Sequence, residues 1–288
     1  MKVLLVYPLT PDTFWSFKHV LRFVSKRAAF PPLGLLTVAA MLPTDWQLKL
    51  VDLNVTRLTD DDLRWADYVM LSAMIVHKAS VSDVADRCRR FRKPVIAGGP
   101  LFTTGRAAFP DIDHFVLGEA EELMPQVIED MRCGSLRHTY AAPSRPDIAR
   151  APAPRWDLID FRHYITMSVQ FSRGCPFDCE FCDIVVMNGR VPRTKSPAQL
   201  IAELAQLRLH GWLDMVFVVD DNFIGNKKQA KALLQELILL RTNTHTKTGF
   251  LTESSANVAD DPELCDIMVR AGFKKIYVCI ETPSAESM

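Results

Sequence analysis

The sequence has no net charge, no long hydrophobic run and no segment typical of an export signal. Its 34 basic residues balance 34 acidic ones, which argues against a nucleic-acid partner, since such proteins usually carry a basic excess. The longest nearly apolar stretch, residues 32–42, is far shorter than the roughly 20 residues that cross a bilayer. The first residues lack the cationic segment of a signal peptide and soon reach Pro8. We therefore expect a cytoplasmic protein without a transmembrane segment.

The chain does contain enough apolar residues for substantial cores, and it contains seven cysteines. A length of 288 residues with 48% apolar residues allows one large domain or two ordinary ones. In a cytoplasmic protein, cysteines more often bind metal or take part in chemistry than form disulfides. The cysteines are therefore the first place to look for a function.

Short apolar runs alternate with helical patterns through the first half of the chain. The expected strands are 2–8, 47–54, 68–74, 94–97 and 115–117, and the expected helices are 33–42, 80–91 and 119–133. The last helix is expected to begin at Glu119, because the glutamates there would favour a helix N-terminus, and to end at Gly134. The alternation predicts an α/β fold, with a doubly wound Rossmann-like domain over residues 1–136.

A proline-rich stretch follows, and residues 137–166 are predicted to be a linker. The alternation then restarts over residues 167–288, with expected strands 168–171, 215–219, 249–253 and 275–280 and expected helices 197–209, 227–240 and 262–271. Ser196 is the expected N-cap of the first of these helices, with Gln199 as its capping-box partner. Four strands are fewer than the eight of a closed barrel, so we expect a partial (β/α) barrel that stops after its fourth strand, in a fragment of a longer protein.

Three cysteines stand in one loop after the first strand of this second domain. Cys175, Cys179 and Cys182 have C-x3-C-x2-C spacing, and thiolates this close together can converge on one soft metal centre. A structural zinc site would need a fourth ligand, normally from a second cysteine pair, and the remaining four cysteines form none. Three ligands would leave one iron of a four-iron cluster open to a substrate or cofactor. Zinc binding and unliganded cysteines are the alternatives.

The motif, with the aromatic Phe181 just before the third cysteine, resembles the signature of the radical S-adenosylmethionine (SAM) enzymes. The resemblance implies a 4Fe–4S cluster bound by the three cysteines, SAM at the open iron and a partial barrel of six strands. It also implies that one electron from the cluster cleaves SAM to a radical, which abstracts hydrogen from an unactivated carbon. A reductant such as flavodoxin or ferredoxin would then be a partner.

Acidic residues follow the other strands of this domain, at the end where parallel barrels carry their active sites. Asp220 and Asp221 replace the Gly-Gly-Glu segment that many members of the family use to bind the methionine amine. The resemblance therefore implies that one of the two lies near that amine. Glu253 and Glu281 are expected as further polar contacts of the cofactor. The alternative for each acid is that it caps the following helix.

A doubly wound domain before such a barrel resembles the cobalamin-binding domain of class B radical enzymes. Ser72 begins a segment similar to the S-x-L motif of that domain, and Gly98 and Gly99 match its G-G motif, where glycines allow close approach of a large ligand. The usual D-x-H-x-x-G motif is absent, so either cobalamin binds without a protein axial ligand or the domain has another role. Three histidines are expected to be surface or packing residues and not cobalt ligands: His19, His77 and His114.

Further segments are similar to a subgroup that includes hopanoid C-2 methylases and relatives of the anaerobic magnesium-protoporphyrin ester cyclase: residues 12–17, 27–36, 172–183, 190–196 and 220–226. The resemblance implies a cobalamin-dependent C-methyltransferase acting on an unactivated carbon of a small molecule or of a lipid such as a hopanoid. A lipid substrate would add a peripheral membrane location to the cytoplasmic one. Two alternatives stay open: a radical SAM oxidative cyclase or other non-methylating enzyme acting on a tetrapyrrole or lipid, and a non-catalytic metal-binding fragment.

Overall fold

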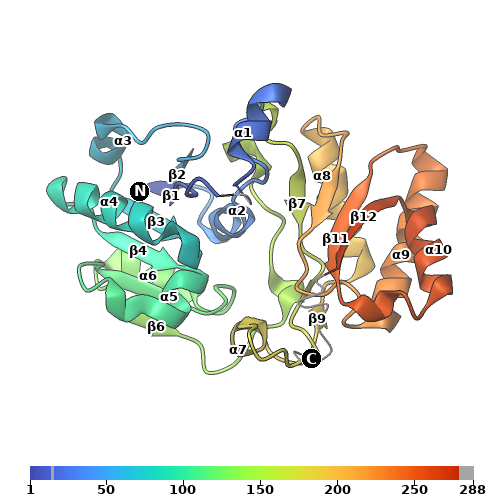
Figure 1. Ribbon diagram of the computed structural model, residues 1–288. Coiled ribbons are helices and arrows are strands. Elements are labelled where there is room, and N and C mark those ends of the chain that lie inside the picture. Colours follow the sequence, from blue (N-terminus) through green and yellow to red (C-terminus); the bar gives the residue numbers. More distant parts are fainter. Residues whose placement is uncertain (14–15, 279–288) are drawn as a thin grey trace. The chain divides into compact units, whose positions relative to one another are not determined.

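The computed structural model describes residues 1–13 and 16–278. The chain forms two compact units that divide between Ile165 and Thr166. Each unit is an α/β structure built on its own parallel sheet (Figure 1). The expected fold class, a doubly wound domain followed by a partial barrel, is therefore confirmed.

A six-stranded parallel sheet runs through the first unit, in the order β2-β1-β3-β4-β5-β6. Its strands are β1 Lys2–Tyr7, β2 Gln47–Asp52, β3 Tyr68–Ser72, β4 Val95–Gly98, β5 His114–Leu117 and β6 Thr139–Ala141. The strand order reverses between β1 and β3, which is the doubly wound pattern. Open α/β sheets of this kind bind their ligands beyond the carboxyl ends of the strands.

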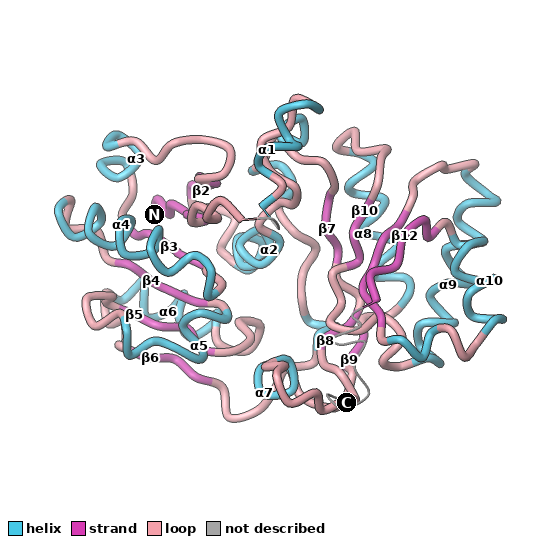
Figure 2. Tube along the Cα trace, in the orientation of Figure 1, coloured by secondary structure: helices cyan, strands magenta, loops and turns pink. Residues whose placement is uncertain are grey.

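Helices cover both faces of this sheet (Figure 2). Leu4 and Val6 of β1 pack with residues of α3, α4 and α5, whereas Val3 and Leu5 pack with residues of α2 and α6. This alternation follows from the two-residue period of a strand. The helices are α1 Lys18–Leu21, α2 Leu33–Met41, α3 Asp60–Trp65, α4 Lys78–Arg90, α5 Pro100–Gly105 and α6 Met124–Cys133, with 3-10 turns at Arg22–Val24, Ile75–His77 and Arg106–Ala108.

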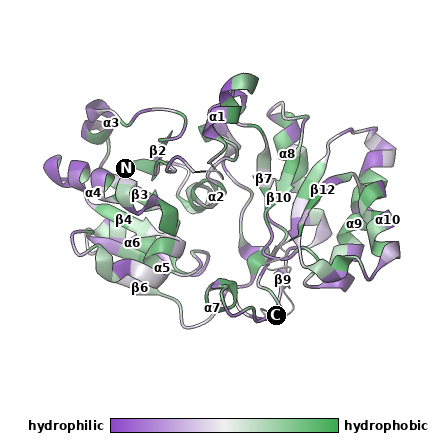
Figure 3. Ribbon diagram, in the orientation of Figure 1, coloured by the Kyte–Doolittle hydropathy of each residue, from purple (hydrophilic) through white to green (hydrophobic). Residues whose placement is uncertain are grey.

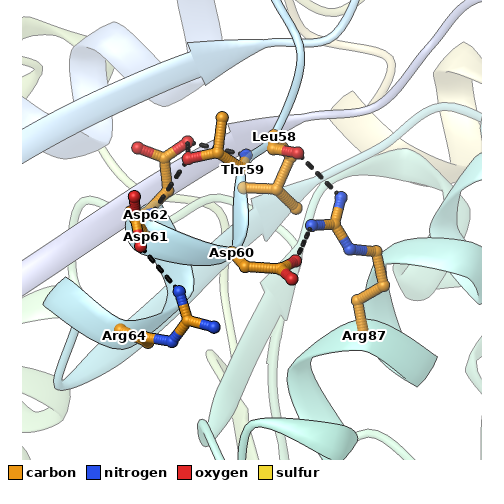
Figure 4. A network of polar contacts seen from close by, with 7 residues as sticks. All are labelled: Leu58, Thr59, Asp60, Asp61, Asp62, Arg64 and Arg87. Atoms are coloured by element: carbon orange, nitrogen blue, oxygen red, sulfur yellow. Dashed lines mark hydrogen bonds and ion pairs between the residues drawn. The ribbon is translucent and has the colours of Figure 1, made fainter.

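Helix α3 has no counterpart among the expected helices, and polar contacts account for its formation (Figure 4). Thr59 and Asp62 form a capping box, in which each side chain accepts a hydrogen bond from the other residue's backbone N–H. Asp60 also pairs with Arg87 of α4 at 2.7 Å. These contacts stabilise a helix of six residues that hydrophobic periodicity alone does not reveal.

Two expectations for the first unit need correction. Helix α6 begins at Met124 and not at Glu119, because Pro125 occupies the first turn, where proline is favoured. Nearly all of the expected linker at 137–166 belongs to the first unit, which ends at Ile165. This segment contains β6 and 3-10 turns at Ile148–Arg150, Trp156–Leu158 and Phe161–His163. Its Trp156 and Tyr164 are buried, and the Tyr164 hydroxyl donates to Asp52 at 3.0 Å, so this segment packs on the first unit.

The second unit contains a four-stranded parallel sheet in the order β12-β11-β10-β7 and a two-stranded antiparallel pair, β8 and β9. The strands are β7 Met167–Val169, β8 Ser172–Arg173, β9 Arg193–Thr194, β10 Val216–Val218, β11 Phe250–Ser254 and β12 Phe273–Val278. The helices are α7 Ile184–Asn188, α8 Pro197–Leu209, α9 Lys227–Thr244 and α10 Pro262–Ala271, with a 3-10 turn at Ala256–Val258. The four main strands and their connecting helices are the expected βα steps of a partial barrel.

The helix ends of the second unit follow their local sequence signals. Ser196 caps α8 and forms the expected capping box with Gln199, and Gly272 ends α10 in the left-handed region with φ 104°. Helix α9 continues to Thr244 and not to Leu240, because no glycine or proline interrupts it there.

Hydropathy varies strongly among the helices (Figure 3). Helix α2 is mostly apolar and buries Leu35, Leu36 and Ala39, whereas α4 is polar outside its buried stripe. Within residues 1–13 and 16–278, no helix combines the length and the hydropathy that a membrane-spanning segment needs.

Candidate functional site

The three motif cysteines lie in the loop between β8 and β9 of the second unit. All three are free thiols; Cys175 and Cys182 are half-buried and Cys179 is exposed. The Cys175 N–H donates to the Gly189 carbonyl at 3.1 Å, and the Cys182 N–H donates to the Cys179 carbonyl at 3.0 Å. The loop is therefore folded back on itself and keeps the three thiols on one short segment.

Gly174 holds the start of this loop in a conformation that other residues avoid. Its φ is +101°, and a Cβ atom there would lie 2.9 Å from the Gly189 carbonyl oxygen and 3.1 Å from that of Val191. Only glycine allows the segment before Cys175 to pass this close to the residues that precede β9.

The described cysteines are not arranged around one ion. Within residues 1–13 and 16–278, no group of three His, Cys, Asp or Glu side chains could hold a single metal ion. A cuboidal iron–sulfur cluster instead binds each thiolate to a different iron, so its ligands are spaced more widely than those of zinc. Phe181, between the second and third cysteine, has 65% of its surface exposed, so its ring is open to contact a ligand of the loop.

Two carboxylates after β10 hold the segment that leads into the cysteines. Asp220 is buried and accepts hydrogen bonds from the Phe171 N–H at 2.7 Å and the Ser172 hydroxyl at 2.8 Å. Burial raises the pKa of Asp220 to about 7, against the lowering effect of these two donors. Asp221 accepts from the Gly174 N–H at 2.7 Å and from the side-chain amide of Asn188 at 2.9 Å.

The predicted acids Asp220, Asp221 and Glu253 do not cap the helices that follow them. The N-cap of α9 is Asn226 and that of α10 is Asp261. Glu253 lies near the carboxyl end of β11 with an exposed side chain. Although much of the side chain is exposed, partial desolvation of its carboxyl group and the nearby charge of Asp221 raise the pKa of Glu253. Glu281 lies outside the described residues. The expected contacts of these acids with SAM remain predictions.

In the first unit, Ser72, Gly98 and Gly99 come together beyond the carboxyl ends of β3 and β4. They line a cavity of about 60 Å³, whose other walls are mostly apolar and include Leu35 and Met124. Gly99 has φ +94°, and a Cβ atom there would lie 2.8 Å from the Ser72 hydroxyl oxygen and 3.1 Å from the Ala73 carbonyl oxygen, so only glycine lets these two segments pass this close to each other. Backbone, apolar side chains and one hydroxyl thus face the same space.

The three histidines differ in their surroundings. His77 is buried: its Nδ1 accepts from the Met74 N–H at 3.2 Å and its Nε2 lies 3.2 Å from the Thr10 hydroxyl. Because Nδ1 is an acceptor, Nε2 carries the proton, and burial lowers the pKa of this ring. His19 is exposed beside Asp12, and His114 hydrogen-bonds to the Arg137 carbonyl.

Two family descriptions match the two units. The Radical SAM superfamily matches residues 169–287, and the B12 binding domain matches residues 23–128. These matches agree with the cysteine loop in the second unit and the glycine-lined cavity in the first. The chain thus combines a segment that matches the Radical SAM superfamily with a segment that matches the B12 binding domain. The suspected family is therefore confirmed.

Curated relatives match this chain along its whole length. An uncharacterized methyltransferase of Synechocystis sp. is 44% identical over 294 residues, which cover 100% of this chain and 54% of the relative. The hopanoid C-2 methylase of Rhodopseudomonas palustris is 35% identical over 292 residues, covering 100% of this chain and 55% of the relative. The chain thus spans about half the length of these relatives.

A solved structure shows the same fold at low sequence identity. The radical SAM methyltransferase TsrM of Kitasatospora setae, solved with tryptophan substrate and a SAM analogue, has a TM-score of 0.76 and 17% identity, covering 99% of this chain and 60% of that one. A second structure of TsrM, with cobalamin and a 4Fe–4S cluster, gives the same score.

The family implies a 4Fe–4S cluster, SAM and cobalamin, and the residues present fit these groups. Three free thiols on one glycine-anchored loop fit a cluster with an open iron, and the glycines and apolar residues at the carboxyl ends of β3 and β4 fit close approach of a large cofactor. Sequence reasoning missed two residues that hold the loop, Asn188 and Asn222. Asn222 follows an expected strand, whereas Asn188 ends α7, which is not among the expected helices. No signal in the sequence reveals the partners of either residue.

Proposed function

We propose that this chain contains the cofactor-binding part of a cobalamin-dependent radical SAM C-methyltransferase, which acts on an unactivated carbon of a lipid such as a hopanoid. The observation that carries this proposal is the occurrence of the cysteine loop and the glycine-lined cavity in one chain that is 35% identical, along its whole length, to a hopanoid C-2 methylase. The Synechocystis methyltransferase, at 44% identity, supports the same type of reaction.

When bound, the cluster supplies an electron to SAM, and cobalamin carries the methyl group to be transferred. The chain's own part is to bind and orient. Cys175, Cys179 and Cys182 would hold the cluster and leave a site open for SAM. Asp220 and Asp221 fix the segment that leads into the first cysteine. Glu253 lies near the carboxyl end of β11 and would offer a carboxylate to SAM. A one-electron donor such as flavodoxin or ferredoxin completes the reaction.

The test is the mass of the product. The full-length protein, anaerobically reconstituted with iron, sulfide and cobalamin, is incubated with a reductant, SAM with a labelled methyl group and a hopanoid. We expect a product heavier by one methyl group, and no product from Cys179→Ala. Cys133→Ala removes an exposed cysteine outside the motif and should retain the activity. Cleavage of SAM without methyl transfer would instead favour a non-methylating radical enzyme, such as the related anaerobic cyclase of Synechocystis, which is 25% identical.

The cavity of the first unit provides a separate test of cobalamin binding. Ala120 lines this cavity, so Ala120→Trp would fill it. We expect the variant to lose cobalamin while it keeps its iron, because the cysteines belong to the other unit. Ala107→Trp is a matched control at an exposed position outside the cavity. Equal cobalamin content in the two variants would place the cofactor elsewhere.

A lipid substrate raises the question of how the protein reaches a membrane, and we propose peripheral binding through α1 and the turn after it. Phe23, Val20 and Val24 have 88%, 58% and 51% of their surfaces exposed. Lys18 and Arg22 stand among these apolar residues, and Asp12 offsets one of the charges. Exposed apolar side chains interleaved with cations suit an anionic lipid surface.

Sedimentation with vesicles tests this surface. We expect the protein to bind vesicles that contain phosphatidylglycerol more strongly than vesicles of phosphatidylcholine alone, and Phe23→Ser to weaken that binding. Leu209→Ser is the matched control, since Leu209 is 86% exposed on α8. An unchanged affinity of Phe23→Ser would refute the proposed membrane contact.

A further inference from the structure

The side chain of Asn222 contacts the sulfur of Cys175, the first cysteine of the motif. Asn222 follows Asp220 and Asp221 after β10, and it is 2% exposed. Its side-chain nitrogen Nδ2 is 3.8 Å from the Cys175 Sγ and 3.0 Å from the Ser255 hydroxyl oxygen. Its carbonyl oxygen Oδ1 is 3.3 Å from the Ser255 backbone nitrogen. This one buried amide thus connects the cysteine loop with the segment after β11.

The neighbours of Asn222 determine which way its amide points. The Ser255 backbone N–H can only donate, so the oxygen of Asn222 must face it. The Ser255 hydroxyl donates to Asn257 at 2.6 Å and is therefore free to accept from Asn222. Nδ2 carries two protons: one points to the Ser255 hydroxyl, and the other points to the Cys175 sulfur. The reverse orientation would place two acceptors or two donors face to face.

We infer that Asn222 is a positioning residue that donates a hydrogen bond to the Cys175 sulfur and thereby raises the reduction potential of the cluster. This inference rests on the proposed function, because it requires that Cys175 binds a cluster. Reduction adds one negative charge, which is shared with the thiolate sulfurs. A donor to such a sulfur stabilises the reduced form more than the oxidised form, and hydrogen bonds to sulfur are among the groups that set cluster potentials.

The structure gives Asn222 this role and gives its two neighbours a different one. Asp220 and Asp221 accept hydrogen bonds from the backbone before Cys175, so they fix where the loop begins. Of these three consecutive residues, Asn222 is the one with a described hydrogen bond from its side chain to a motif sulfur. Replacing either carboxylate should therefore change the assembly of the site, whereas replacing the amide should change the electronic properties of an assembled site.

The test is the midpoint potential of the anaerobically reconstituted full chain, titrated with dithionite and followed by electron paramagnetic resonance, with iron content measured in parallel. Asn222→Leu keeps the volume of the side chain and removes the donor. We expect normal iron loading and an equilibrium constant for cluster reduction that falls about tenfold, equivalent to about 59 mV for a one-electron couple. Ser255→Ala is the matched control: it removes the other partner of Nδ2 but leaves the sulfur contact, so the constant should change less than about twofold.

A second variant covers the case in which Asn222→Leu does not load iron. Asn222→Asp keeps an oxygen for the Ser255 N–H and replaces the donor with an acceptor, so the potential should also fall. An unchanged potential in a loaded variant, or an equal shift in Ser255→Ala, would overturn the inference. So would loss of iron in both Asn222 variants with normal loading of Ser255→Ala, since that would give Asn222 a purely structural role. A wild-type protein that binds no cluster would refute the proposed function itself.

Discussion

Asp220 should make the stability of the second unit depend on pH, because its carboxyl group is buried. Burial raises its pKa from 3.8 to about 7. At low pH the group is protonated in both the folded and the unfolded chain and costs nothing. As the pH rises toward 7, the Asp220 carboxyl group ionises in the unfolded chain but stays protonated in the folded one. The unfolded chain is therefore stabilised, and the free energy of unfolding falls. Above pH 7 the loss is complete.

The size of the effect follows from the shift. About three pKa units at 1.36 kcal/mol each give about 4 kcal/mol in total, of which about 2.5 kcal/mol falls between pH 5 and pH 8. Asp220→Asn should abolish this part of the pH dependence. An asparagine oxygen can still accept from the Phe171 N–H, and its amide can donate to the Ser172 hydroxyl, so the fold should be retained.

Urea titrations of the wild type and the variant at pH 5 and pH 8 measure the difference. Asp260→Asn is the matched control, because it removes a carboxylate at an exposed position of the same unit. We expect the control to keep the wild-type pH dependence. If Asp220→Asn also kept it, the carboxyl group would not titrate in a buried state, and the reasoning would be refuted.

Three further substitutions test how the second unit is held together. Lys195→Met should cost about 3 to 5 kcal/mol of unfolding free energy, because it leaves the buried Glu203 without its ion-pair partner; a loss below about 1 kcal/mol in urea titration would contradict this. Gly174→Ala should cost about 1 to 3 kcal/mol of unfolding free energy and reduce iron loading, because Gly174 has a positive φ and close carbonyl oxygens. Gly34→Ala is the control: a Cβ there meets open space, so the variant should be neutral or more stable. Equal thermal stability of the two variants would argue against strain at Gly174. Ser196→Ala should cost about 1 kcal/mol by removing the cap of α8, and an unchanged melting temperature would show that the capping box contributes nothing.

Local signals predicted those parts of the fold that depend on neighbours in the sequence. The start of α8 at Pro197 and the end of α10 before Gly272 agree with the expected residues, because a cap interacts within three or four positions. Where two local signals competed, the prediction failed: the glutamates at 119–122 suggested a helix start, but Pro125 determined it.

In the candidate site, too, the sequence reveals what depends on neighbouring residues and misses what depends on distant ones. Cys175, Cys179 and Cys182 were found from their spacing alone, since the motif lies within one loop. The contacts that hold this loop join residues about 47 positions apart, as between Gly174 and Asp221 or Cys175 and Asn222. They arise because β10 lies beside β7 in the sheet, and no local pattern contains that pairing. The sequence therefore predicts which cysteines bind the cluster, but it does not reveal the residues that hold their loop in place.

The most direct test of the central claim is the metal content of the anaerobically reconstituted protein, together with its products from SAM under reducing conditions. The account predicts about four irons per chain, release of deoxyadenosine, and loss of both in Cys179→Ala but not in Cys133→Ala. Zinc in place of iron, or deoxyadenosine release that survives Cys179→Ala, would contradict it.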